Sequence, residues 1–92
     1  MAEQNTLLTM LKTDIGISST GYDARLSQII EASKKAIIAE GVSTLNVSEI
    51  DDAQLVVMYA AWLWRNRDTG EGMSRMLRLA LNNRIFSEKM RG

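Results

Sequence analysis

Hydrophobic residues recur along the chain at intervals of three and four positions, the spacing that favours helices with one apolar side. The pattern predicts four helices, over about residues 6–15, 21–40, 49–67 and 73–85. The third begins at Glu49 or Asp52, glycines gather at the breaks, and proline is absent. The pattern therefore predicts an all-α fold, a small bundle of four helices with short loops, in a single domain over residues 1–92. Residues 86–92 are expected to form a flexible or docking C-terminal tail.

The second predicted helix has the most regular pattern, with its apolar residues inside an arc of about 120°. Gly41 follows it and can adopt the left-handed conformation that often ends a helix, because it has no Cβ to clash. Taken together, the four patterns predict a core made of these side chains: Leu11, Leu26, Ile29, Ile30, Ile37, Leu55, Tyr59, Trp62, Leu77 and Leu81.

The third predicted helix is apolar on two opposite faces. Tyr59 and Trp62 share one face, and Ala61 and Trp64 share the other. Residues two apart on a helix point about 200° away from each other, so one face cannot bury both tryptophans. The helix is either central and surrounded by its own chain, or clamped between its domain and another chain. Our hypothesis is that Trp62 lies in the core and Trp64 at or near an interface.

The fourth predicted helix combines an apolar side with a basic side. Met76, Leu77 and Arg84 fall on the first, and Arg75 and Arg78 on the second. The arginines support an alternative function, that of a small DNA-binding or DNA-packaging accessory protein that uses this helix. Dedicated nucleic-acid-binding proteins usually have a basic excess. This chain has 11 basic and 11 acidic side chains, and hence a net charge of zero.

The chain contains neither cysteine nor histidine. These absences remove the usual ligands of zinc, copper and haem, together with the usual general base and the thiol nucleophile. No phosphate-binding glycine loop, zinc-protease motif or EF-hand pattern is present. We therefore expect no enzymatic activity, no catalytic residues, no cofactor and no metal site.

Neither a signal peptide nor a membrane span is visible in the sequence. The N-terminus has no basic segment followed by a long apolar one. The longest uncharged run, residues 53–64, is shorter than the roughly 20 apolar residues that a spanning helix needs. We expect a protein that is intracellular when it is made and that has no membrane partner.

Charge is distributed unevenly along the chain. Residues 1–61 carry four basic and eight acidic side chains, whereas residues 62–92 carry seven basic and three acidic ones. This asymmetry is compatible with ordinary surface composition. It also suits a polar subunit whose acidic part meets the basic part of a neighbour or partner.

The order of the segments resembles the small head-to-tail connector, or adaptor, proteins of tailed bacteriophages and of prophages in Gram-positive bacteria. The resemblance is carried by "LLTMLKTDIGI", "GYDARLSQIIEASKKAI", "EGV", "DDAQLVVMYAAWLWRNRD" and "MSRMLRLALNNRIF", which together cover nearly the whole chain. The third helix ends in an aromatic-x-Asn-Arg pattern that begins at Trp64. A second Asn-Arg pair ends at Arg84 in the fourth helix. Ser74 departs from the family, in which a proline opens the last helix.

The resemblance implies a non-catalytic virion structural protein, a connector subunit that assembles as a ring under the portal and extends the DNA channel. Its implied partners are the portal protein, neighbouring copies in the ring and the next connector or stopper protein. DNA would pass through the channel without sequence-specific binding. The implied location is the head–tail interface of the virion, with the bacterial host cytoplasm during assembly. The candidate residues for the subunit or portal interface are Trp64, Arg67, Arg75, Arg78, Arg84, Phe86 and Met90.

Overall fold

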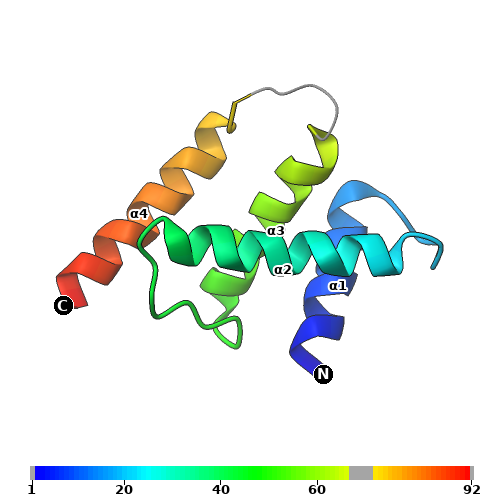
Figure 1. Cartoon of the computed structure of the whole chain (residues 1–92), viewed down its shortest axis with the longest axis horizontal. Coiled ribbons are helices and arrows are strands. Elements are labelled where there is room, and N and C mark those ends of the chain that lie inside the picture. Colours follow the sequence, from blue (N-terminus) through cyan, green and yellow to red (C-terminus); the bar gives the residue numbers. More distant parts are fainter. Residues whose placement is uncertain (1, 67–71, 92) are drawn as a thin grey trace.

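The protein is built from four helices, with α3 in contact with the other three (Figure 1). A computed structural model describes residues 2–66 and 72–91, with the side chains of residues 6–66 and 72–90. The helices are α1 (Ala2–Ile15), α2 (Asp23–Ala39), α3 (Ile50–Arg65) and α4 (Arg75–Arg91). The described residues contain no strand, and the predicted all-α fold of four helices is confirmed.

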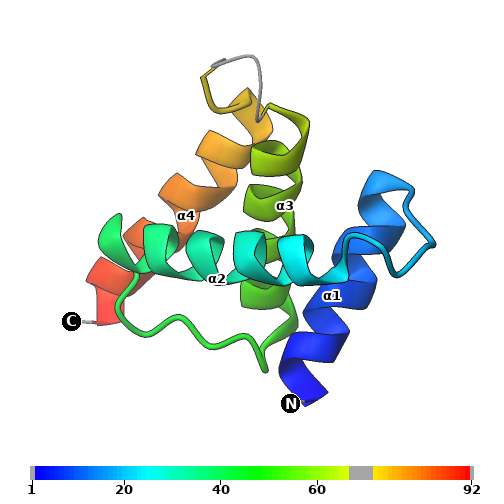
Figure 2. The ribbon, with the colours of Figure 1, turned by 45° about the vertical axis from the view of Figure 1, so that its right-hand side comes forward.

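The helices form a flat arrangement in which α2 crosses α3, and α1 and α4 lie on either side of α3 (Figures 1 and 2). The extents of the molecule are 41 × 32 × 17 Å, so the shortest dimension is little more than the thickness of one helix packed on another. In this arrangement α4 is an edge helix. It packs on α3 with one side and leaves the other side open.

The third helix is central in the domain. This agrees with the interpretation that its two apolar faces are covered by its own chain. Val56 and Ala60 are completely buried, and Ala53, Val57 and Ala61 are nearly so. Small side chains on the second face let neighbouring helices approach closely. The chain's own helices therefore cover most of the circumference of α3.

Both tryptophans lie at the end of α3, and neither is fully buried. The ring of Trp62 packs edge-on against Tyr59 with centroids 5.6 Å apart, and its Nε1–H donates to the carbonyl oxygen of Gly72 over 3.1 Å. Trp64 packs edge-on against Tyr22 with centroids 5.5 Å apart. Each indole therefore packs against a tyrosine of the same chain, and Trp62, which was expected in the core, is only partly buried. The placement of Trp64 at or near an interface stays a prediction.

The other residues expected in the core are inside it. Leu11, Leu26, Ile29, Ile30, Ile37, Leu55, Tyr59, Leu77 and Leu81 are all buried. Trp62 is the exception, because its indole N–H reaches the edge of the protein to meet the backbone before α4.

The helix limits differ from the prediction at both ends of the chain. The first helix begins at Ala2 rather than residue 6, because the preceding residues are good helix formers and contain no break. Ser74 caps the last helix, accepting a hydrogen bond from the N–H of Leu77 over 3.2 Å. That helix continues to Arg91, so the expected tail is helical throughout its described part. No glycine or proline interrupts it before Gly92.

The second helix ends as predicted, at a glycine with positive φ. Gly41 has φ of +124°, a conformation that residues with a side chain rarely adopt. The chain turns there into the segment 42–49, in which Val42 is completely buried. This turn places the segment beside α4, where it takes part in the polar network described below.

Candidate assembly surface on the fourth helix

The outer side of α4 exposes a row of large apolar side chains. Met76, Leu79, Phe86 and Met90 have exposed fractions of 75%, 60%, 65% and 73%. With the exposed Asn83 they occur at alternating steps of three and four residues, the spacing of the seam in a coiled coil. We call these five residues the α4 stripe. They lie within an arc of about 80° on one side of the helix.

The inner side of the same helix supplies the contacts that hold α4 in place. Leu77 and Leu81 are buried, and Ile85 packs against the core. Met76 was predicted to share this apolar side, but it is 75% exposed. The helix is therefore apolar on two sides, of which its own chain covers one.

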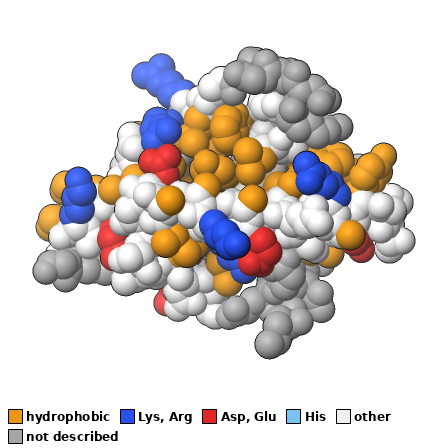
Figure 3. Space-filling model, viewed as in Figure 1, with side chains coloured by type: hydrophobic (Ala, Val, Ile, Leu, Met, Phe, Trp, Pro, Cys, Tyr) orange, Lys and Arg blue, Asp and Glu red, His pale blue; other side chains and the backbone are white. Residues whose placement is uncertain are grey.

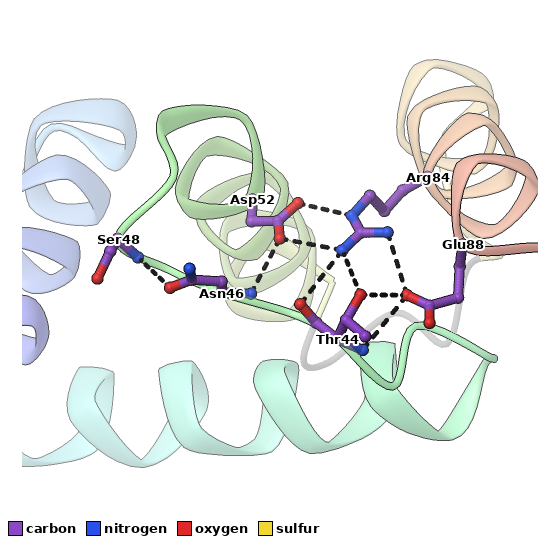
Figure 4. Close-up of polar contacts among 6 residues, drawn as sticks. All are labelled: Thr44, Asn46, Ser48, Asp52, Arg84 and Glu88. Atoms are coloured by element: carbon purple, nitrogen blue, oxygen red, sulfur yellow. Dashed lines mark hydrogen bonds and ion pairs between the residues drawn. The ribbon is translucent and has the colours of Figure 1, made fainter. Parts of the chain in front are cut away.

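A network of charged groups fixes the rotation of α4 about its axis (Figure 4). The guanidinium of Arg84 donates two hydrogen bonds to the carboxylate of Asp52, from Nε over 2.7 Å and from Nη2 over 3.2 Å. Asp52 is 5% exposed and also accepts from the backbone N–H of Asn46 over 2.9 Å. Such paired hydrogen bonds join α3, α4 and the segment before α3 in one fixed geometry.

Glu88 extends this network by one further turn of α4 (Figure 4). Its carboxylate accepts from Arg84 Nη1 over 3.3 Å, from the Ser43 hydroxyl over 3.0 Å, and from both the hydroxyl and the backbone N–H of Thr44. The hydrogen bond from the Thr44 hydroxyl contributes most to lowering the pKa of Glu88 to about 2. The hydrogen bond to Asp52 raises the pKa of Arg84 in the same way, by stabilising its charged form.

The candidate arginines separate into different environments. Arg84 points inward, with 11% of its side chain exposed, and its guanidinium is held by carboxylates of its own chain. Arg75 is exposed, and Arg78 is exposed with its guanidinium 3.8 Å from Glu40. Arg67 lies outside the described residues. Of the arginines considered for DNA binding, Arg84 is therefore engaged inside its own chain, and Arg75 and Arg78 remain exposed beside the stripe.

The remaining candidates also fall in different places. Phe86 and Met90 belong to the α4 stripe, whereas Trp64 is half-buried at the far end of α3 against Tyr22. Leu79 was not singled out from the sequence, although the heptad spacing of residues 76, 79, 83, 86 and 90 was available as a signal. It was missed because the apolar residues of the inner side alone satisfy a helical pattern.

Hydrophobic side chains also reach the surface on the face that carries α2. They gather above α2 between α3 and α4, with basic and acidic side chains around them (Figure 3). Within the described part of the chain, no group of three or more acidic residues has the arrangement of a metal site. In the same part, none of the helices has the length and apolar character needed to cross a membrane.

No protein-family model, curated protein or solved structure matches this chain. The resemblance to phage connectors thus rests on the order and spacing of the sequence segments. The surface of α4 has to be interpreted from its own chemistry.

Proposed function

We propose that this protein is a head-to-tail connector subunit, a virion structural protein that assembles as a ring under the portal. The observation that carries the proposal is the α4 stripe, an exposed apolar row on a helix whose inner side is already packed. Contiguous apolar surface of this kind marks a protein–protein contact. The order of the sequence segments supplies the class of partner.

Three features support an assembly role for α4 in particular. The stripe has coiled-coil spacing, which suits docking against another helix. The ion pairs of Arg84 with Asp52 and Glu88 hold the helix in one rotation, so the stripe is presented before a partner arrives. A rigid surface loses less conformational entropy on binding than a mobile one.

Native mass spectrometry with the portal protein of the same phage tests this proposal. The expected result is a complex containing several copies of this chain per portal ring. The Leu79→Gln/Phe86→Gln double variant should reduce the occupancy about tenfold or more, because both side chains are anchors of an apolar contact. Their exposure of 60% and 65% means that the fold should survive, which circular dichroism can check.

The matched control is Ile38→Gln, which removes an exposed apolar side chain from α2 rather than α4. Occupancy should be unchanged in this variant. A portal that binds neither the parent protein nor the control would refute the connector proposal. Equal binding of the parent and the stripe variant would remove the stripe from the assembly surface.

A further inference from the structure

A groove runs along α3 on the side away from α2. Three hollows, of about 650, 480 and 300 Å³, are lined by α3 together with α1, α4 or the segment before α3, and all three share Met58. Two of them also share Gln54, and two share Asp14. We call this the Met58 groove and define it by Met10, Thr13, Gln54, Met58, Ala61 and Ala80.

The size of the groove suits a helix. Its floor extends along α3 from Gln54 to Arg65, which is about 16 Å at 1.5 Å per residue. The α4 stripe extends from Met76 to Met90, or about 21 Å on the same scale. Methionine side chains in the floor and walls can adjust their shape to an inserted side chain.

The charge around the groove is acidic at the end where α3 begins. Glu49 and Asp51 are exposed there, and Asp52 is also part of the lining. The basic side chain in this lining is Arg84, whose guanidinium is engaged by carboxylates of its own chain. At the other end, Arg65 and Asp14 both line the groove, and Arg65 donates to the backbone oxygen of Asp14 over 2.9 Å.

The α4 stripe has the complementary charge along one flank. Arg75 and Lys89 are exposed and lie beside the apolar row on the same side of the helix. Two stripes packed antiparallel against each other would bring these basic flanks together, which is unfavourable. Arg75 and Lys89 lie at opposite ends of the stripe, so in either direction of docking into the groove one of them would lie at the end that carries Glu49 and Asp51.

We propose that the α4 stripe of one copy docks into the Met58 groove of a second copy. This inference deepens the proposed connector function, because it names the two surfaces that neighbouring subunits would join. Met76 and Asn83 of the stripe also border the groove, whereas Leu79, Phe86 and Met90 line none of the three hollows. These three anchors and the groove floor on α3 are therefore different surfaces, so the contact is head-to-tail and leaves one set of anchors and one groove floor unoccupied on every pair. Repetition of such a contact generates a closed ring or an open filament.

Cysteine cross-linking tests the contact directly, because the chain has no cysteine of its own. The Phe86→Cys and Gln54→Cys variants both change exposed side chains, one on the stripe and one in the groove. Equal amounts are mixed at high concentration, alone and with the portal protein, and oxidised. The mixed disulfide should form about tenfold faster than either symmetric one, because docking raises the local concentration of the two thiols.

The control partner is Glu31→Cys, on the exposed side of α2. It should give only the slow background reaction with Phe86→Cys. Equal cross-linking to the two partners, a predominant disulfide between two Phe86→Cys copies, or no cross-link in any mixture would overturn the inference.

Charge reversal supplies a second test. Glu49→Lys/Asp51→Lys in the Gln54→Cys variant should reduce the mixed disulfide about tenfold, and Arg75→Glu/Lys89→Glu in the Phe86→Cys variant should restore it. A reduction without restoration would contradict the charge pairing. Portal binding without the cross-link would refute the groove while leaving the connector function intact. A cross-link without portal binding would support docking into the groove and refute the connector function.

Discussion

The third and fourth helices share a sequence property but differ in what covers them. Each is apolar on two sides. Around α3 the chain's own helices cover both sides, and Val56, Ala60 and Ala61 are all buried. Around α4 they cover only the side of Leu77 and Leu81, and the α4 stripe stays exposed.

The difference follows from position rather than from composition. The central helix has neighbours on several sides, whereas α4 lies at the edge of a flat arrangement (Figure 2). An apolar second face on an edge helix has no neighbour within its own chain. Such a face is therefore the better candidate for contact with a partner.

The largest expected effect separates the two sides of α4. Leu81→Ala removes a completely buried side chain and should lower the free energy of unfolding by about 2–5 kcal/mol. Leu79→Ala changes an exposed side chain two positions away and should change it by no more than about 0.5 kcal/mol. Urea unfolding of both variants measures the contrast, and equal losses would contradict the two-sided description of α4.

The ion pair that joins the two helices gives the next largest effect. Asp52→Ala leaves Arg84 without its main partner and should lower the free energy of unfolding by about 2–3 kcal/mol. This is at the lower end of the loss for breaking a buried ion pair, because this pair is not fully enclosed. Asp51→Ala is the matched control, since its carboxylate is exposed in the first turn of α3, where the interaction with the helix dipole amounts to about 0.3–1 kcal/mol. Thermal unfolding would show the pair to be unimportant if both variants lost the same stability.

A substitution on the second face of α3 tests whether its own chain covers it. Ala60→Leu forces extra volume into a completely buried position and should destabilise the monomer by about 1–3 kcal/mol. Gln54→Leu adds a similar side chain on the exposed side of α3 and should change stability by no more than about 0.5 kcal/mol. If the monomer tolerated both changes equally, the second face of α3 would be open rather than covered.

The smallest effect concerns Glu88 and depends on pH. The pKa of Glu88 is lowered from 4.5 to about 2, so its carboxylate stabilises the folded state above pH 4.5. That contribution is lost as the pH falls from 4.5 towards 2, because the carboxylate then becomes protonated in the folded state as well. The parent should melt at a higher temperature than Glu88→Gln at neutral pH, and the difference should shrink through this window. A difference that stays constant down to pH 2 would contradict the network around Glu88.

All four helices could be located from the sequence because each buries at least one apolar face whose spacing can be read from the sequence alone. It also identified Gly41 as the end of α2, since the left-handed conformation there favours glycine. It failed at the outer ends of α1 and α4, where good helix formers extend the helices beyond the apolar pattern.

The polar network and the exposure of the stripe were the parts that spacing could not provide. Arg84 was grouped with the apolar side of its helix, but its partner Asp52 lies 32 positions away and was considered only as a possible first residue of the third helix. Met76 was assigned to the same side, although the packing of Leu77 and Leu81 turns it outward. Contacts between distant segments decide both cases.

The sequence by itself determined the helical class, the break positions, nearly all of the core and the uneven distribution of charge. These follow from local periodicity and composition, which each segment carries independently of the others. The tertiary structure alone decided that both apolar faces of α3 are covered while one apolar face of α4 is open, and that α1, α3 and α4 form a groove. The physical reason is that burial of a second apolar face depends on which helices become neighbours, and that is a property of the packed chain as a whole.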